Sequence, residues 1–154
     1  MKITDFSITP FQHKLINPLK TANQHYSHRS GFIIKINSED LFGCGESSPL
    51  SGFSAESLKE VSYALESYHL AIMDIGETSV AELLSFIPIH CENLPSVEFG
   101  LETAIYDLAS KIEGKTFSQY LNPNAKDQIK SNGIVGIHTP KDNYKIMKVK
   151  VGFR

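Results

Sequence analysis

Two lysines near the end of the sequence have the type and spacing needed for proton transfer. Lys148 and Lys150 lie two positions apart in residues 147–152 (MKVKVG). The alternation predicts a strand with both lysines on one face. Burial and a neighbouring ammonium group both lower the pKa of a lysine, and a lysine tuned in this way can act as a general base near neutral pH. The same spacing also fits a half-buried strand whose two lysines are solvated, so both interpretations remain open.

Other residue combinations give weaker chemical signals. Gly43 and Gly45 could belong to a phosphate cradle, but no lysine or helix start follows at the spacing of a phosphate-binding loop. His25 and His28 are three positions apart in a polar segment, where surface histidines are a better explanation than metal ligands. The sequence contains no Gly-x-Ser-x-Gly nucleophile motif.

The composition describes an ordinary globular chain. Fifteen Lys and Arg against 17 Asp and Glu give a net charge of −2, which lacks the basic footprint of a nucleic-acid binder. Cys44 and Cys91 form no metal-binding pair and are expected to be small buried residues in a reducing compartment. Without a signal-peptide pattern or a long apolar run, the expected location is the cytoplasm and no membrane partner is expected.

Three strands are predicted in the first third of the chain. Residues 2–9 favour a strand that Pro10 ends, and residues 31–37 and 41–46 form a hairpin around a short turn. Between them, residues 11–30 are polar and uneven and are expected to be a long loop. Loops of this length in a compact domain are usually functional or mobile.

Three helices follow the strands. An amphipathic helix over 55–73 is expected to start at Ser54 as N-cap, and a short helix over 79–86 is expected to stop at Pro88. The clearest helix spans 95–113, with a proline at its first position and glycine directly after it. Strands followed by helices predict an α+β fold, a three-stranded antiparallel sheet followed by a helical bundle.

The remaining residues form a different pattern. A boundary near Asn122-Pro123-Asn124 divides the sequence into residues 1–122 and 123–154. Short strands at 131–136 and 147–152, joined by a short helix within 140–146, predict a parallel β-α-β unit. A closed (β/α)₈ barrel needs at least about 200 residues, so these 154 residues cannot contain one.

The sequence resembles the enolase superfamily, in the muconate-lactonizing-enzyme subgroup whose barrel carries a Lys-x-Lys motif. The matching stretches are residues 19–22 (LKTA) with Arg29, residues 43–54 (GCGESSPLSGFS), residues 95–100 (PSVEFG) and residues 148–152 (KVKVG). The run Ser-Pro-Leu-x-Gly-Phe-Ser is more similar to o-succinylbenzoate synthases than to dipeptide epimerases. The resemblance implies an enolase-like N-terminal capping domain over 1–122 and the incomplete start of a TIM barrel over 123–154.

The resemblance also implies a reaction. Family members abstract a proton α to a carboxylate while Mg²⁺ stabilises the enediolate. The implied enzyme is a lyase of menaquinone biosynthesis that dehydrates a cyclohexadiene carboxylate to o-succinylbenzoate. Lys150 would be the base and Lys148 the charge beside it. The family's metal carboxylates come from later barrel strands, so these 154 residues alone are expected neither to bind Mg²⁺ tightly nor to turn over substrate.

Two capping loops, residues 19–29 and 47–53, would close over a small carboxylate substrate and exclude water. Amides of residues 20–28 are therefore expected to exchange faster than those of residues 31–37. The implied substrate-binding residues are Thr21, Arg29, Ser48, Leu50, Ser51 and Phe53.

Two other functions remain open at this point. One is a dipeptide or N-acylamino-acid racemase or epimerase of the same subgroup. The other is a non-catalytic α+β binding module. Whether these residues are part of an enzyme is therefore left open by the resemblance. Unpaired barrel strands would also allow self-association or pairing with a partner chain.

Overall fold

The chain divides into two compact units, and each is described by itself. The computed structural model describes residues 1–21, 24–135 and 145–149. The first unit is Met1–Pro123 and the second is Asn124–Arg154. No helix among the described residues is long and apolar enough to cross a membrane.

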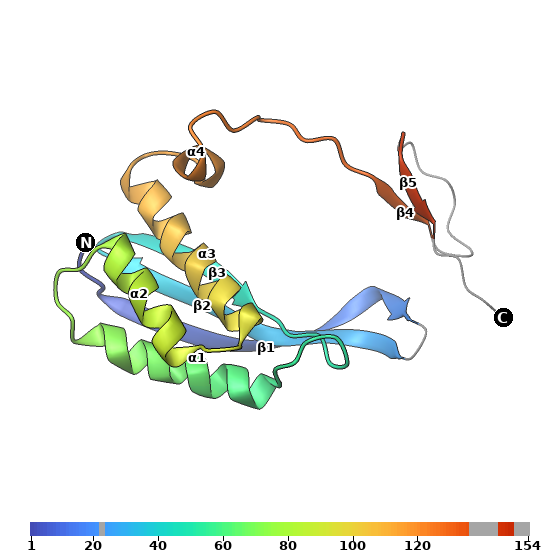
Figure 1. Ribbon diagram of the computed structural model, residues 1–154, viewed down its shortest axis with the longest axis horizontal. Coiled ribbons are helices and arrows are strands. Elements are labelled where there is room, and N and C mark those ends of the chain that lie inside the picture. Colours follow the sequence, from blue (N-terminus) through green and yellow to red (C-terminus); the bar gives the residue numbers. More distant parts are fainter. Residues whose placement is uncertain (22–23, 136–144, 150–154) are drawn as a thin grey trace. The chain divides into compact units, whose positions relative to one another are not determined.

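The first unit combines an antiparallel sheet with helices on one face (Figure 1). Its strands follow one another in the sheet and are β1 (Asp5–Lys20), β2 (His25–Ser38) and β3 (Leu41–Ser47). Its helices are α1 (Leu58–Met73), α2 (Val80–His90), α3 (Pro95–Ile112) and α4 (Phe117–Leu121). The prediction of a three-stranded antiparallel sheet followed by helices is confirmed.

The helices cover the face of the sheet on which alternate residues are apolar. Ile34 and Ile36 of β2 are fully buried, whereas Ile33, a residue of the opposite face, remains 38% exposed. Phe6 of β1 pairs with Ile36, and Ile34 pairs with Gly45 of β3, so the buried positions run across the sheet. The two-residue period of a strand therefore places one face in the core and the other in solvent.

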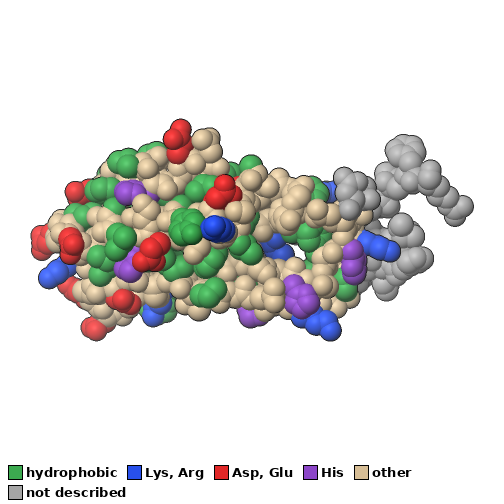
Figure 2. All heavy atoms as spheres, turned by 90° about the horizontal axis from the view of Figure 1, so that it is seen from below, with side chains coloured by type: hydrophobic (Ala, Val, Ile, Leu, Met, Phe, Trp, Pro, Cys, Tyr) green, Lys and Arg blue, Asp and Glu red, His purple; other side chains and the backbone are tan. Residues whose placement is uncertain are grey.

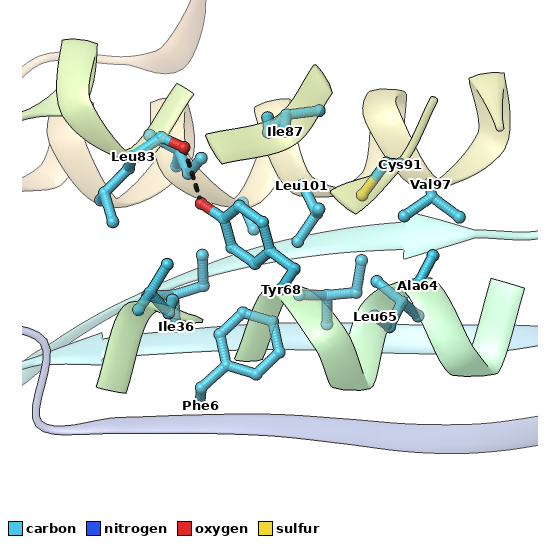
Figure 3. Packing of buried hydrophobic residues seen from close by; sticks show 14 of the residues in the cluster. Phe6, Ile36, Ala64, Leu65, Tyr68, Leu83, Ile87, Cys91, Val97 and Leu101 are labelled. Carbon is cyan, nitrogen blue, oxygen red and sulfur yellow. Dashed lines mark hydrogen bonds between the residues drawn. The ribbon is translucent and has the colours of Figure 1, made fainter. Parts of the chain in front are cut away.

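Tyr68 of α1 lies at the centre of this core, between helices and sheet (Figure 3). Its side chain is fully buried, and its hydroxyl donates a hydrogen bond to the Leu83 carbonyl of α2 at 3.0 Å. The Phe6 ring lies 6.0 Å from the Tyr68 ring, centroid to centroid. Because a buried hydroxyl needs a partner, this bond fixes α2 relative to α1.

Glycines let α3 pack directly on the backbone of β3. A Cβ atom on Gly43 would lie 2.0 Å from the Ala104 carbonyl oxygen, and one on Gly45 would lie 1.9 Å from the Gly100 carbonyl oxygen. A Cβ on Gly100 would in turn meet the backbone of Glu46 at 3.0 Å. The Gly-Cys-Gly segment thus accommodates a helix rather than a phosphate, since the helix backbone fills the space.

The prediction of a loop over residues 11–30 is wrong. β1 continues to Lys20 and β2 begins at His25, so the two strands extend past β3 as a two-stranded arm, residues 11–20 and 25–31. β1 is an edge strand, so Pro10 does not end it, and a register irregularity between Lys14 and Leu19 accommodates a second proline. The arm has a polar sequence because both of its faces are exposed to solvent, although its two strands are paired by backbone hydrogen bonds.

Two helix boundaries also differ from the prediction. α1 begins after Ser57, not Ser54, because Ser57 and Glu60 form a reciprocal capping box. α2 continues through Pro88 to His90. A proline removes one backbone hydrogen bond, and the following turn is held by the bond from the Cys91 N–H to the Ile87 carbonyl, both residues being buried.

In the second unit, β4 (Gly133–Val135) and β5 (Met147–Val149) form a parallel pair, as predicted. The helix expected within residues 140–146 falls mostly on residues 136–144, which lie outside the described residues. Residues 145 and 146 are not helical.

The two cysteines should differ sharply in reactivity. Cys91 is fully buried, as predicted, but Cys44 on the outer face of β3 is only partly buried. Burial, together with the smaller effect of the Glu98 charge, raises the pKa of the Cys91 thiol to about 12. At pH 8 a maleimide should therefore label Cys44 first and Cys91 only after unfolding in urea, as followed by mass spectrometry. Equal labelling rates in the native protein would contradict the buried position of Cys91.

Candidate functional site

Loop 47–54, which connects β3 to the segment before α1, has a defined internal structure. The Leu50 carbonyl accepts hydrogen bonds from the N–H groups of Phe53 and Ser54 at 2.9 and 2.8 Å. The Ser54 hydroxyl accepts one from the Leu50 N–H at 2.9 Å. Gly52 takes a positive φ of 79°, which suits a residue without a side chain. These bonds form a tight turn that presents the Phe53 side chain, 71% exposed, to solvent.

Side chains of β2 that belong to the arm bind loop 47–54. The Arg29 guanidinium donates to the carbonyls of Ser48 and Pro49, the second at 3.4 Å. The Tyr26 hydroxyl donates to the Ser51 carbonyl. The Ser48 hydroxyl donates to the Ser30 carbonyl at 3.2 Å. Four hydrogen bonds therefore join two segments that are about twenty residues apart in the sequence.

Two adjoining hollows flank loop 47–54. The larger, about 790 Å³, is lined by Arg29, Glu46, Ser48, Phe53, Ser54, Ala55, Glu56, Pro95, Ser96 and Phe99. The smaller, about 460 Å³, is lined by Tyr26, His28, Arg29, Ser30, Pro49, Leu50, Ser51, Gly52, Ser54, Ala55, Glu56, Ser57 and Leu58. Both combine exposed apolar groups with hydroxyls and charged groups, which is typical of a site for a small polar organic molecule.

Glu56 lines both hollows and caps α3. Leu94, the N-cap residue of α3, offers no side-chain hydrogen bond. Instead, Glu56 accepts one from the Ser96 N–H at 2.9 Å, and the Ser96 hydroxyl lies 3.0 Å from that of Ser47 at the end of β3. A carboxylate at a helix N-terminus is favoured by the helix dipole. Glu56 thereby connects the end of loop 47–54 to the start of α3.

The stability contributed by Glu56 should depend on pH. Burial raises the pKa of its carboxyl, but hydrogen bonds with the side chain and backbone of Ser96 lower it by more, so the pKa lies below its ordinary value. A group with a lowered folded-state pKa stabilises the protein above its unfolded-state pKa, and this contribution is lost as the pH falls through the folded-state pKa. Urea unfolding of Glu56→Gln should therefore show a deficit against the parent protein at pH 7 that shrinks at pH 3.

Glu102→Gln, an exposed position on α3, is the matched control and should give no deficit at either pH. An equal deficit for Glu56→Gln at both pH values would contradict the favoured carboxylate.

The structure places five of the proposed substrate-binding residues around loop 47–54. Arg29, Ser48, Leu50, Ser51 and Phe53 all line one or both hollows.

Thr21 lies instead at the tip of the arm. Its hydroxyl donates to the Gln24 carbonyl at 3.1 Å and accepts from the Gln24 N–H at 3.0 Å, so it closes the turn between β1 and β2. Lys148, on β5 in the second unit, is exposed. Lys150 lies outside the described residues.

Three residues of this region were not predicted from the sequence: Tyr26, Gln24 and Glu56. Tyr26 and Gln24 fall within the segment expected to be a loop, where no periodicity marks them. Glu56 falls inside the predicted helix, because that prediction places the N-cap at Ser54. The capping-box pattern Ser57-x-x-Glu60 was the available signal that Glu56 precedes the helix and is free to bind elsewhere.

Among the described residues, no three His, Cys, Asp or Glu side chains come together in a group that could hold a metal ion. Glu46 and Glu56 share the larger hollow, but Glu56 is engaged by Ser96. The part of the chain that the structure describes therefore offers no ligand set that fits Mg²⁺, which needs several oxygen ligands in near-octahedral geometry.

Solved structures share the fold over nearly the whole chain. A dipeptide epimerase from Enterococcus faecalis V583, complexed with Mg and the dipeptide L-Leu-L-Tyr, is 20% identical with a TM-score of 0.83, covering 99% of this chain and 46% of its own. One from Cytophaga hutchinsonii, complexed with Mg and D-Ala-L-Val, is 23% identical with a TM-score of 0.83, covering 99% and 45%. The chain thus spans less than half the length of these structures.

The sequence comparison identifies the first unit more specifically. A search of curated proteins found no match. The family model described as MenC, N-terminal domain, matches residues 7–108. That range contains the arm, loop 47–54, α1, α2 and most of α3, so it covers both hollows and every hydrogen bond that shapes them. The chain belongs to the MenC N-terminal domain family.

Proposed function

We propose that this chain is the N-terminal portion of an o-succinylbenzoate-synthase-like lyase, whose capping domain covers the active site. The observation that carries the proposal is the family match over residues 7–108 together with the loop built there. The Ser-Pro-Leu-x-Gly-Phe-Ser run that resembles o-succinylbenzoate synthases forms the turn that presents Phe53 beside Arg29. The enzyme's reaction is dehydration of a cyclohexadiene carboxylate to o-succinylbenzoate.

In this proposal, loop 47–54 and the arm form the cover of the site. Phe53 supplies an exposed apolar surface for the substrate ring, and Leu50 supplies a second one in the smaller hollow. Ser48 and Ser51 supply polar groups in the hollows, whereas the Thr21 hydroxyl holds the turn at the tip of the arm. Covering the substrate excludes water, which strengthens the electrostatic interactions within the site.

The charge of the arm suits an anionic substrate. The arm, residues 11–20 and 25–31, contains Lys14, Lys20 and Arg29 and no Asp or Glu. Figure 2 shows histidine and basic side chains over the arm and acidic side chains over the helical part. A surface of one sign raises the local concentration of ligands of the opposite sign. The product o-succinylbenzoate carries two carboxylates and no cationic group, whereas a dipeptide carries an ammonium group, so this surface favours the lyase.

Lys150 is the proposed base that removes the proton α to the carboxylate, and Lys148 is the positive charge beside it. Both assignments are supported by the Lys-x-Lys resemblance and by the parallel strand pair to which Lys148 belongs. The solved structures with Mg support a metal cofactor for the complete enzyme, which would supply charge stabilisation of the enediolate. Since the described residues offer no ligand set, the metal would be held by other parts of that enzyme.

Dipeptide epimerisation is the second candidate, because solved structures that share this fold are dipeptide epimerases. Both reactions begin with abstraction of a proton α to a carbonyl group. They differ in the second step, since the lyase expels a hydroxyl group and the epimerase returns a proton to the other face.

The test compares both reactions in the full-length protein that contains these residues, purified with Mg²⁺. The cyclohexadiene carboxylate should be converted to o-succinylbenzoate, followed by absorbance, with a kcat/KM at least 100-fold above that for epimerisation of L-Ala-L-Glu, followed by proton exchange in D₂O. The reverse ratio would assign the epimerase. Absence of both reactions would overturn the proposal in favour of a non-catalytic module or an unrelated activity.

A further inference from the structure

The hydrogen bonds between the arm and loop 47–54 come almost entirely from side chains of β2. Arg29 holds the carbonyls of Ser48 and Pro49, and Tyr26 holds the carbonyl of Ser51. These three carbonyls lie within four consecutive residues of the loop, just before Phe53. Because the Leu50 carbonyl ties Phe53 and Ser54 back into the same turn, fixing the three carbonyls also fixes the place where Phe53 emerges.

Tyr26 is joined to a third residue of the same contact, Gln24. The Tyr26 hydroxyl also lies within hydrogen-bond distance of the Gln24 side-chain amide. A phenol has one proton to donate, so the Ser51 carbonyl takes that proton while the Gln24 amide, turned to present its NH₂ group, donates to the phenol oxygen. The Tyr26 hydroxyl then donates one hydrogen bond to Ser51 and accepts one from Gln24.

On the loop side, Gly52 lies in close contact with the Gln24 side chain. A Cβ atom at Gly52 would lie between 2.6 and 2.9 Å from the atoms of the Gln24 side-chain amide. The tip of loop 47–54 and the arm near Gln24 therefore touch at a position where only glycine fits without displacing the amide. Figure 1 shows the loop after β3 lying beside the arm.

We propose that the arm and loop 47–54 form one coupled unit, in which Tyr26 and Arg29 are positioning residues that fix loop 47–54 against the arm. The arm and loop 47–54 then move together and not independently. Arg29 uses two of its five N–H donors for this purpose, so positioning leaves donors for a carboxylate. The inference rests on the proposed function only for the statement that this unit covers substrate; the coupling itself is a property of the chain.

The first test perturbs the arm and measures the loop in the 154-residue chain. In Tyr26→Phe, the amides of Leu50, Phe53 and Ser54 should exchange with deuterium at least tenfold faster than in the parent protein. The amides of Ile34 and Ile36 should keep their rates. Tyr63→Phe removes a hydroxyl from an exposed tyrosine of α1 and should change neither set.

The second test perturbs the loop and measures the arm. Gly52→Ala should displace Gln24 and accelerate exchange of the Thr21 and Gln24 amides. The Thr21 N–H donates to the Gln24 carbonyl, and the Gln24 N–H donates to the Thr21 hydroxyl. Gly76→Ala is the matched control, since Gly76 has a φ of 80° and nothing within 4 Å of its added Cβ. It carries the same backbone strain without the contact, and the two arm amides should keep their parent rates.

Two results would overturn the coupling: unchanged loop exchange in Tyr26→Phe, or acceleration of Ile34 and Ile36 by the same factor as the loop. Unchanged arm exchange in Gly52→Ala would also overturn it. These outcomes are separate from the proposed function, because exchange is measured without substrate. Coupled loops in an enzyme without dehydratase activity would reject only the function, and independent loops in an active dehydratase would reject only the coupling.

Discussion

Replacing Gly45 with alanine should destabilise the first unit by about 3 kcal/mol or more, because the new methyl group has no space. Its Cβ would lie 1.9 Å from the Gly100 carbonyl oxygen and 3.1 Å from the Ala104 nitrogen. Both atoms belong to the backbone of α3, so no side-chain rotation can relieve the overlap and the helix must shift away from β3. Urea unfolding followed by circular dichroism measures the loss.

Gly114→Ala separates this steric effect from backbone strain. Gly114 has a φ of 63° and nothing within 4 Å of an added Cβ, so alanine there should cost only about 1–2 kcal/mol from the left-handed conformation. If Gly45→Ala costs no more than Gly114→Ala, the close packing of α3 on β3 is contradicted.

Truncating Leu108 to alanine should cost about 2–5 kcal/mol, since it removes a large side chain from a fully enclosed position. Leu108 is fully buried on the face of α3 that packs on Gly43, and its backbone nitrogen lies 2.5 Å from where a Cβ on Gly43 would be. The surrounding backbones are in contact and cannot collapse far into the space. The measurement is again urea unfolding, with the midpoint and slope fitted separately.

Leu70→Ala provides the matched control on α1, where the leucine side chain is 67% exposed. It should change the free energy of unfolding by less than about 0.5 kcal/mol. A cost below about 0.5 kcal/mol for Leu108→Ala as well would show that α3 does not bury this face.

The elements with strong periodicity were predictable from sequence. α3 combines a proline at its first position, an apolar stripe and a terminal glycine, and its observed bounds, Pro95–Ile112, differ from the prediction by one residue. The hairpin of β2 and β3 was predicted over residues 31–37 and 41–46 from two strand-favouring runs around a short turn. In each case a local pattern and the tertiary environment favour the same structure.

The arm could not be predicted because its stability does not come from a buried face. His13, Lys14 and Leu19 pair with residues of β2 while most side chains remain in solvent, so no two-residue hydrophobic period appears. Pro10 and Pro18 also suggested chain breaks, although an edge strand tolerates a proline where no ladder hydrogen bond is needed. Backbone hydrogen bonds between strands do not depend on residue type, so the pairing of the arm leaves no pattern in the sequence.

The candidate site was only half predictable for the same reason. Loop 47–54 was found from its turn residues and its family resemblance. The residues that hold the loop were not predicted from the sequence, because Tyr26 binds a backbone carbonyl and Glu56 binds a backbone N–H. Every residue has such a carbonyl, and every residue except proline has such an N–H, so neither contact constrains the type of its partner, and only the fold brings the two atoms together.

The most direct test of the proposed reaction is the turnover of the cyclohexadiene carboxylate by the full-length protein carrying Lys150→Ala. Removing a general base lowers the rate about 10²–10⁴-fold. We predict a loss of kcat in this range, while Lys130→Ala, an exposed lysine of the same unit, keeps the parent rate. Dehydration at the parent rate in Lys150→Ala would contradict the assignment of this chain to an o-succinylbenzoate-synthase-like lyase that uses its Lys-x-Lys motif.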